Sequence, residues 1–211
     1  MLDLLGNSIS AIIGNMILFL TIPIIWWFIG YRKKCSFFRW IGLIKPKLVC
    51  NWKWIILFIL VYGFFYNFDF SIFVSSKDLE VLNSSENVSS NVYSGLGLIA
   101  VLPAFLTTFI ANGFCEEVLF RGFIGKRLIN KFGRCFGIII QGVLFGLLHN
   151  ALYFLSGVDI SLSYHLILFI FTGMGGLLLS ILDEKIYNGS IIPSIVLHGL
   201  GNFITNLLVM F

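Results

Sequence analysis

Residues 95–119 read GLGLIAVLPAFLTTFIANGFCEEVL, a run in which the first charged side chain is Glu116. A helix needs roughly 20 apolar residues to cross a hydrocarbon core about 30 Å thick, so this stretch is long enough to span a membrane. The rest of the chain agrees, because 58% of its 211 residues are hydrophobic and only 11% are charged. A soluble domain carries about 25% charged residues. The composition predicts an integral membrane protein and excludes a disordered, collagen-like or nucleic-acid-binding chain.

Five further segments are long and apolar enough to cross a membrane. The sequence therefore predicts an all-α, polytopic bundle of about six transmembrane helices. The expected spans are residues 8–30, 52–74, 95–119, 136–155, 162–182 and 188–211. Within one membrane domain, we distinguish N-terminal helices and loops at residues 1–94 from a helical core at residues 95–211.

Basic residues predict the orientation of these spans, because Lys and Arg collect in short cytoplasmic loops. Seven of the 14 basic residues lie within residues 32–53, and four more lie within residues 126–134. We expect both stretches, and residues 183–185, to be cytoplasmic loops. Both termini and residues 75–91 are expected on the opposite side. The basic stretches are also candidates for contact with anionic lipid.

Ionisable side chains inside the spans need an explanation, because burying a charge in hydrocarbon costs several kcal/mol. On a helix, Glu117 and Arg121 lie one turn apart on one face and can pair, whereas Glu116 points about 100° away. This spacing leaves Glu116 free for chemistry. A purely structural charge network at a helix end is the alternative explanation.

Two later spans carry further polar side chains at helical spacing. Phe145 and His149 share a face at i, i+4, and so do His198 and Asn202. A rise of about 1.5 Å per residue places Glu116 roughly 10 Å, His149 about 20 Å and His198 about 15 Å from the cytoplasmic ends. The three side chains fall in a common band, so we predict that they converge.

Two other ionisable residues do not join this band. His165 and Asp69 lie near the outer ends of their spans. We interpret both as interfacial or packing residues.

A convergent glutamate, two imidazoles and an amide fit two types of chemistry. In the first, Glu116 is a general base that deprotonates a water, and His149 holds that water or moves its proton. His198 and Asn202 then donate hydrogen bonds to the oxyanion of a tetrahedral intermediate. In the second, Glu116, His149 and His198 bind one divalent metal ion such as zinc. The metal-free version is narrowly favoured, because an Asn amide suits hydrogen-bond donation better than zinc ligation.

The motifs E-E-x-x-x-R, F-x-x-x-H and H-x-x-x-N occur in this order on successive spans. Together they resemble the CPBP intramembrane proteases, the CAAX-protease and bacteriocin-processing (Abi) group. Eukaryotic relatives are type II CAAX prenyl endopeptidases, which remove the last three residues of prenylated proteins. The resemblance covers about residues 95–211. It implies an intramembrane endopeptidase, and it leaves the cofactor open between a metal-free glutamate mechanism and one divalent ion.

The resemblance also implies a role for each motif residue. Glu116 corresponds to the water-activating residue, with His149 as its partner. His198 and Asn202 correspond to the oxyanion side of the site. Support of the site is implied for Glu117, Arg121 and Phe145.

Composition and context shape the expected biological role. The frequent Phe, Ile and Asn residues indicate a bacterial member, so we expect a multi-pass protein of the bacterial plasma membrane. Bacteria generally lack prenylated CAAX substrates. We therefore expect a peptide or membrane-anchored protein as substrate, with a role in peptide maturation, bacteriocin self-immunity or processing of a membrane-bound regulator. Membrane lipid is the other expected partner, and the oligomeric state stays open.

Two functions of other classes are kept as alternatives. The first is a non-catalytic immunity or scaffold protein of the same fold, which would not need four costly polar groups in hydrocarbon. The second is a proton- or cation-coupled transporter, because intramembrane Glu and His also mark such paths. The lack of an inverted repeat disfavours the transporter.

Overall fold

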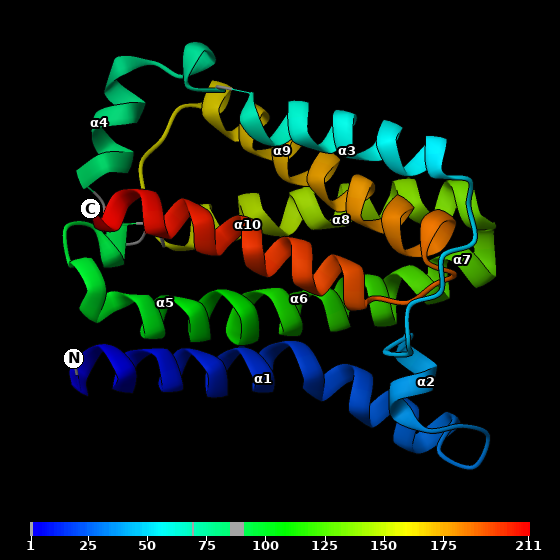
Figure 1. Cartoon of the computed structure of the whole chain (residues 1–211). Helices are drawn as coiled ribbons and strands as arrows, with labels where there is room; N and C mark the ends of the chain where they lie inside the picture. Colours follow the sequence, from blue (N-terminus) through cyan, green and yellow to red (C-terminus); the bar gives the residue numbers. More distant parts are fainter. Residues whose placement is uncertain (1, 69, 85–90) are drawn as a thin grey trace.

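The computed structural model describes residues 2–68, 70–84 and 91–211, and this part of the chain contains helices and loops but no strand. The predicted all-α class is therefore confirmed (Figure 1). Asp69 lies outside the described residues.

The helices follow the order of the predicted spans, with some changed bounds. The N-terminal part contains α1 (Leu2–Gly30), α2 (Phe37–Ile41), α3 (Trp52–Asn67) and α4 (Ser76–Ser84). A continuous helix follows over residues 97–132 and includes α5 (Val101–Leu106), α6 (Cys115–Glu117) and α7 (Lys126–Phe132). The last three helices are α8 (Arg134–Leu155), α9 (Leu162–Ile181, continued by a π-helical turn Leu182–Ile186) and α10 (Ile192–Met210).

Five helices of the described chain are long and apolar enough to cross a membrane, which agrees roughly with the six expected spans. The exception is α3, which has 16 residues and ends at Asn67. Its length is about 24 Å at a rise of about 1.5 Å per residue, less than a full hydrocarbon core. The expected span 52–74 was therefore too long, because a separate 3-10 turn forms at Phe70–Phe73.

Two expected cytoplasmic loops are helical instead. The third span does not end at residue 119, because the helix continues to Phe132 and stops at Gly133, whose φ is 81°. Residues 183–185 lie in the π-helical extension of α9, and Asp183 is only 1% exposed. A charged residue need not end a membrane helix if it finds a partner inside the protein. Several charged residues of this chain are buried in the bundle interior.

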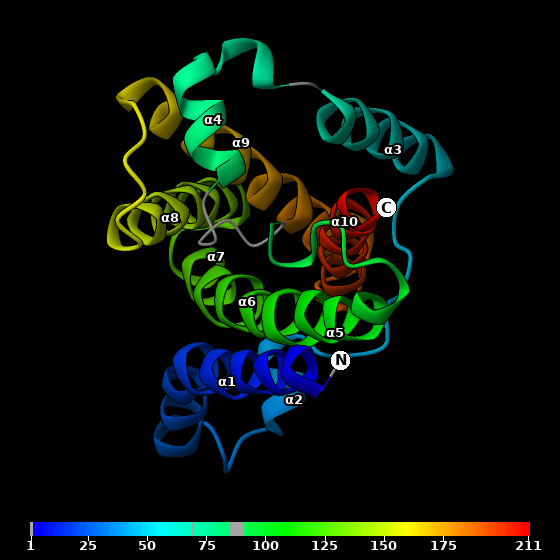
Figure 2. The ribbon, with the colours of Figure 1, turned by 90° about the vertical axis from the view of Figure 1, so that its left-hand side faces the viewer.

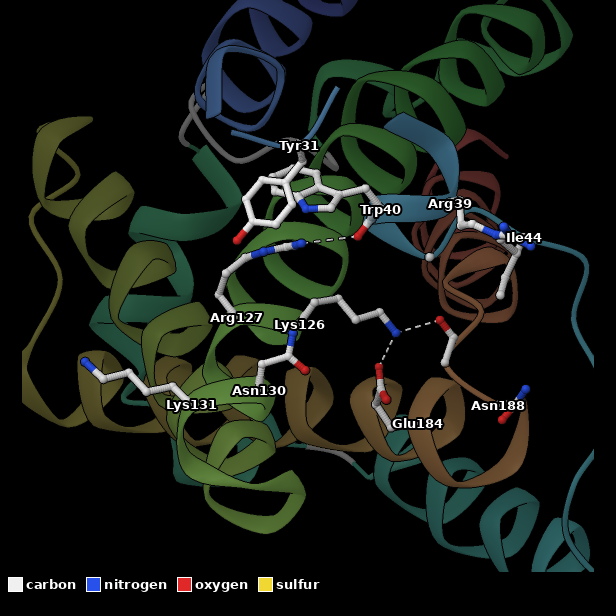
Figure 3. Close-up of a pocket in the computed structure, with 12 residues that line it drawn as sticks. Tyr31, Arg39, Trp40, Ile44, Lys126, Arg127, Asn130, Lys131, Glu184 and Asn188 are labelled. Atoms are coloured by element: carbon white, nitrogen blue, oxygen red, sulfur yellow. Dashed lines mark hydrogen bonds and ion pairs between the residues drawn. The ribbon is translucent and has the colours of Figure 1, made fainter. Parts of the chain in front are cut away.

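Successive long helices run in alternating directions (Figure 1). Both termini and α4 lie at one end of the bundle, whereas α2 and α7 lie at the other. Viewed from the end that holds the termini, α1 lies against the helix of residues 97–132, and α3 lies on the opposite side of the bundle (Figure 2). Basic side chains of α2 and α7 line a pocket at the second end (Figure 3).

The side of the membrane that each end faces follows from the positive-inside rule and is a prediction. In a variant with the four free cysteines replaced by alanine, a cysteine at Ser76 should react with an impermeant reagent added outside intact cells. A cysteine at Lys34, in the basic stretch, should react only after the cells are opened. Labelling of position 34 but not of position 76 in intact cells would reverse the orientation.

The α4 helix is attached to the loop between α8 and α9 through one carboxylate. Asp78 accepts hydrogen bonds from the backbone N of Ser161 at 2.8 Å and from its Oγ at 2.6 Å. These bonds, with one from Ser75, hold the pKa of Asp78 below its usual value. The attachment is therefore present at neutral pH and weakens as the pH falls through that lowered pKa.

The surface of the bundle is apolar and the interior holds polar side chains. Ile17 and Ile29 of α1 are 64% and 80% exposed, whereas Glu117 and Gln141 are fully buried. A lipid environment favours this arrangement, because polar groups must find their partners within the protein. The structure and the composition thus agree on a multi-pass membrane protein.

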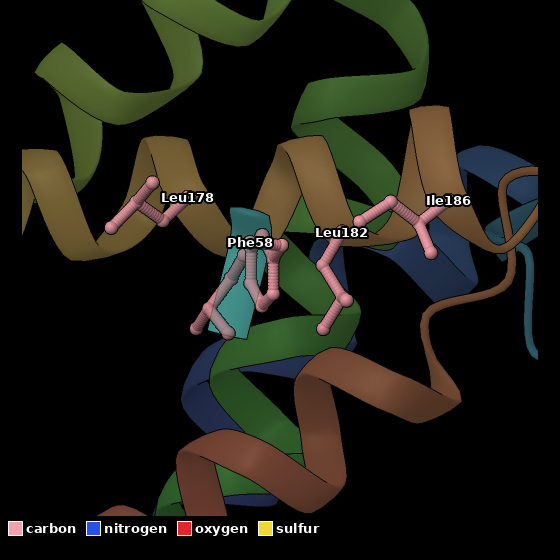
Figure 4. Close-up of a cluster of buried hydrophobic side chains, with 5 residues drawn as sticks. Phe58, Leu178, Leu182 and Ile186 are labelled. Atoms are coloured by element: carbon pink, nitrogen blue, oxygen red, sulfur yellow. The ribbon is translucent and has the colours of Figure 1, made fainter. Parts of the chain in front are cut away.

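Apolar contacts hold the short α3 helix on the bundle. Phe58 packs on Leu178, Leu182 and Ile186 of α9 and its extension (Figure 4). This contact places α3 against α9 and its extension.

Glycines allow α8 and α9 to approach each other closely. A Cβ at Gly142 would lie 2.9 Å from the carbonyl oxygen of Gly173, and a Cβ at Gly146 would lie 2.7 Å from that of Phe169. These contacts involve backbone atoms, which cannot move aside as a flexible side chain can. Small residues at these positions therefore permit the close packing of α8 and α9.

We expect Gly146→Ala to lower the free energy of unfolding by about 1–3 kcal/mol, because the added methyl group overpacks this helix crossing. The matched control is Gly14→Ala on α1, where an added Cβ meets no atom within 4 Å. This control should be neutral or slightly stabilising, because alanine favours helix. Thermal unfolding of both variants in detergent checks the prediction, and equal stability would contradict it.

Candidate active site

The two adjacent glutamates lie on a locally widened helix. The three-residue α-helical segment Cys115–Glu117 is placed between two π-helical segments, Thr107–Phe114 and Val118–Gly125. Such π segments are rare and occur frequently at functional sites. They change which side chains share a face, and the sequence periodicity gave no sign of them.

Both carboxylate oxygens of Glu117 contact partners inside the bundle. Its Oε2 lies 3.0 Å from Nε of Arg121, and its Oε1 accepts a hydrogen bond of 2.8 Å from Nδ1 of His198. The predicted pairing of Glu117 with Arg121 is confirmed. The contact with His198 spans 81 residues of sequence, so the carboxylate joins the helix of residues 97–132 to α10.

Glu116 has a different environment. Its Oε2 is buried, has no hydrogen-bond partner in the described part of the chain and lies 4.0 Å from Nε2 of His198. The side chain is 15% exposed, unlike the fully buried Glu117. Glu117 is therefore neutralised by Arg121, whereas Oε2 of the neighbouring Glu116 accepts no hydrogen bond in the described chain.

Both histidines present the same ring atom to the site. His149 donates its Nδ1 hydrogen to the carbonyl oxygen of Phe145 at 2.9 Å, and His198 donates its Nδ1 hydrogen to Glu117. Oxygen atoms of these types only accept, so the partners fix which ring nitrogen carries that hydrogen. Nε2 of each ring is the atom that remains for a water, a substrate or a metal ion.

Phe145 lies at the centre of the cluster. Its ring centroid is 4.5 Å from that of His149 and 6.2 Å from that of His198. The guanidinium carbon of Arg121 lies over the same ring at 4.2 Å. A cation over an aromatic face is attracted by the ring quadrupole, so Phe145 helps to hold Arg121 while its ring packs beside both histidines.

A close crossing of two helices sets the position of His198. A Cβ at Gly113 would lie 3.2 Å from the backbone N of Gly199, and a Cβ at Gly199 would lie 2.6 Å from the ring of Phe109. Only glycines leave room for α10 to pass at this distance. The close approach at Gly199 brings its neighbour His198 within reach of Glu117.

A small cavity connects the candidate residues of the later helices. It has a volume of about 140 Å³, and its polar lining includes His149, His198 and Asn202. Aromatic side chains of α3, α8 and α9 complete it, namely Tyr62, Phe65, Phe145 and Phe171. Glu116 lies beside this cavity through its approach to His198 rather than in its wall. The predicted convergence of the three spans is thus observed.

Several buried polar residues next to the site were not singled out from the sequence. Asp183 accepts hydrogen bonds from Oγ of Ser194 at 2.7 Å and from its backbone N at 3.2 Å. Ser180 donates to Gln141. The sequence does contain a sign of two of these residues. Gln141 lies four residues before Phe145, and Ser194 lies four residues before His198, so each falls on the same helix face as a motif residue.

The same region contains a cavity of about 10 Å³, close to the size needed for one water molecule. It is lined by Arg121, Gln141, Ser180 and Asp183 among others. Nη1 and Nη2 of Arg121 and Nε2 of Gln141 are buried there without a partner in the described chain. A water in this cavity would give these donors an acceptor.

The residues proposed as metal ligands do not form a ligand set in the arrangement observed. Among the described residues, no group of three His, Cys, Asp or Glu side chains could hold a metal ion. Glu116 and His198 are 4.0 Å apart, near the limit that two zinc bonds of about 2.0–2.2 Å can span in a straight line. A tetrahedral ion would require these side chains to move closer, so we derive no step through a metal.

His165 lies apart from the site and has its own partner. It donates its Nδ1 hydrogen to Oδ1 of Asn150 at 2.8 Å. This contact agrees with the interpretation of His165 as a packing residue.

We expect Arg121→Ala to destabilise the protein by about 3–5 kcal/mol, because it leaves the buried Glu117 carboxylate without its cation. The double variant Glu117→Gln/Arg121→Ala should recover part of that loss, since no unpaired charge remains. Arg134→Ala, at the exposed start of α8, is the matched control and should change stability little. Thermal unfolding in detergent measures all three, and a stable Arg121→Ala protein would contradict the pairing argument.

Comparison with known families gives one match. The model of the family described as type II CAAX prenyl endopeptidase Rce1-like matches residues 98–204, a range that contains every candidate site residue. No curated protein and no solved structure matches the chain significantly.

Proposed function

The chain belongs to the family of Rce1-like type II CAAX prenyl endopeptidases, and from this premise we propose that it hydrolyses a peptide bond within the membrane by means of a water activated by Glu116. Membership of a protease family, with several membrane-spanning helices, implies a lipid environment and a peptide substrate. The family inferred from the three motifs is thereby confirmed.

The proposal rests on one observation, the different environments of the two glutamates. Glu117 is held by Arg121 and His198, whereas Oε2 of Glu116 has no hydrogen-bond partner in the described chain and only approaches Nε2 of His198, at 4.0 Å. A general base needs a carboxylate that is within reach of a water and is not already neutralised. Glu116 meets this requirement and Glu117 does not.

In the proposed reaction, a water lies between Glu116 and the histidines. Glu116 removes a proton from the water, and the oxygen attacks the peptide carbonyl carbon to give a tetrahedral oxyanion. His198, as an imidazolium with Glu117 as its counter-ion, donates its Nε2 hydrogen to that oxyanion. The amide of Asn202, four residues further along α10, is the second proposed donor.

Collapse of the intermediate completes the hydrolysis. The C–N bond breaks, and the proton taken up by Glu116 is returned to the leaving amine, either directly or through His149. One water is consumed and one carboxylic acid and one amine are formed. The base is regenerated, so no cofactor is needed for the proton balance.

A bound divalent metal is the competing proposal for the same residues. If side-chain movement brought Glu116, His149 and His198 together, their oxygen and Nε2 atoms would be suitable zinc ligands, and the ion would supply a Lewis acid. The distances observed favour the metal-free version. We therefore propose a glutamate mechanism.

The lining of the site bears on the substrate class. Part of the wall of the cavity of about 140 Å³ is aromatic, with Tyr62 and Phe65 from α3 and Phe171 from α9. An apolar peptide segment can bury its side chains there without leaving polar groups unpaired. We propose a membrane-anchored protein or an apolar peptide as substrate, in a bacterial plasma membrane, with peptide maturation or bacteriocin self-immunity as the biological role.

Cleavage by the purified protein tests the proposal. The full chain in proteoliposomes is incubated with membrane-bound peptides, including a CAAX-type sequence, and mass spectrometry identifies the products. New peptide ends should appear with wild-type protein and with Glu80→Gln, an exposed carboxylate on α4, but not with Glu116→Ala. Cleavage that persists in Glu116→Ala would overturn the mechanism, and absence of cleavage of every peptide would favour a non-catalytic scaffold.

A further inference from the structure

A large basic pocket lies at the end of the bundle that contains α2 and α7 (Figure 3). Its volume is about 610 Å³, within the range of small-molecule sites. Four separate parts of the chain form it: the end of α1, the α2 region, α7 and the turn after α9. The residues of this basic pocket include Tyr31, Arg39, Trp40, Ile44, Lys126, Arg127, Asn130, Lys131, Glu184 and Asn188.

Two of its cations are fixed in place. Lys126 pairs with Glu184 and also donates to the carbonyl oxygen of Gly189 at 2.6 Å. Arg127 donates to the carbonyl oxygen of Trp40 at 3.3 Å, and its guanidinium carbon lies 3.7 Å from the centre of the Trp40 ring. Side chains that are already ordered lose little entropy when a ligand binds.

The other two cations stand at the rim. Arg39 and Lys131 are exposed, on α2 and α7 respectively. The only carboxylate in the lining is Glu184, which Lys126 already pairs with. Four cations against one carboxylate give the basic pocket a net charge of +3. Such a pocket attracts an anion with several oxygen acceptors, such as a phosphate group.

A second, separate hollow lies on α1. It has a volume of about 450 Å³ and is lined by Ile22, Ile25, Trp26, Ile29 and Gly30, all apolar. Gly30 is followed directly by Tyr31 of the basic pocket. A cationic pocket at the end of the bundle, next in sequence to an apolar hollow on α1, matches a molecule with an anionic head and a hydrocarbon tail.

We propose that the basic pocket binds the phosphodiester headgroup of an anionic phospholipid, with an acyl chain along the hollow on α1. Basic pockets between transmembrane helices on the cytoplasmic side are suited to such headgroups. Lys126 and Arg127, at the centre of the pocket, contact the phosphate oxygens, while the exposed Arg39 and Lys131 on either side attract the headgroup by their charge (Figure 3). This site is separate from Glu116 and His198 and does not depend on peptide hydrolysis.

Lipid titration of the full-length protein tests the proposal. Detergent-purified protein is titrated with phosphatidylglycerol and with phosphatidylcholine of equal chain length, and native mass spectrometry counts the bound lipids. Arg39→Gln/Lys131→Gln should bind phosphatidylglycerol roughly 25-fold more weakly, at about fivefold per charge removed. The control Lys45→Gln/Lys47→Gln changes two exposed cations outside the pocket and should stay within about twofold.

Each other outcome decides against the assignment. Equal binding of the two lipids, or equal loss in the control variant, would show attraction to the basic surface in general. Titration with inorganic phosphate tests whether the ligand is a lipid headgroup or free phosphate. If phosphate alone bound as tightly as phosphatidylglycerol and displaced it at equal concentration, the ligand would be free phosphate and the lipid proposal would be wrong.

Discussion

Replacing Glu116 by glutamine is expected to lower the rate of peptide hydrolysis by about 10²–10⁴-fold while the protein stays folded. The amide keeps the shape of the side chain but cannot accept a proton from water. Folding should survive, because Glu116 has no ion-pair partner closer than the 4.0 Å approach to His198. A neutral amide is also cheaper to bury than a carboxylate.

The rate is measured from product formation under single-turnover conditions, with thermal unfolding as the check on folding. Glu80→Gln on α4 is the matched control, because it changes an exposed carboxylate far from the candidate site in sequence and should retain full activity. Near-normal cleavage by Glu116→Gln would refute both the metal-free mechanism and the version in which Glu116 binds a metal.

The second large effect is expected at His198. Its removal should lower activity by about 10²–10³-fold if Nε2 donates to the oxyanion. Asn202→Ala should have an effect of similar size, because the two side chains face the same cavity. The matched control is His165→Ala, since His165 contacts Asn150 and not the site. Equal activity losses in His198→Ala and His165→Ala would point to a general packing defect.

His198 also distinguishes the two chemistries through a measurement independent of activity. If a metal ion is held, purified wild-type protein should contain it stoichiometrically, and both His149→Ala and His198→Ala should lose it. If Glu116 acts without a metal, active protein should contain no stoichiometric metal, and chelators should leave the rate unchanged. A reversible loss of activity on chelation would overturn the metal-free proposal.

The candidate site could be predicted from the sequence where local geometry decides it. Glu117 and Arg121 pair because residues four apart on a helix are neighbours whatever the rest of the fold does. Phe145 and His149 meet for the same reason. That polar side chains of three spans converge also followed from the high cost of burying each of them separately in lipid.

The sequence-based prediction of helix ends and loops was wrong where charged residues find their partners inside the bundle rather than in water. The helix of residues 97–132 continues past the charged Glu117 and Arg121, because they satisfy each other within the protein. Asp183 was assigned to a loop because it is charged, yet it is 1% exposed and accepts two hydrogen bonds from Ser194. A charge count predicts exposure only when no buried partner exists.

Length and hydropathy in the sequence determined that this chain is a membrane-spanning helical bundle, since a hydrocarbon core accepts only long apolar helices. The motif spacing determined that Glu117 pairs with Arg121 and that Phe145 lies beside His149. The tertiary structure alone decided that Glu117 binds His198 and that Oε2 of Glu116 is left without a hydrogen bond, in the part of the chain described. The physical reason is that this choice depends on the close crossing at Gly113 and Gly199 and on the π-helical segments. Both set the rotation and distance of whole helices, which periodicity along one helix does not encode.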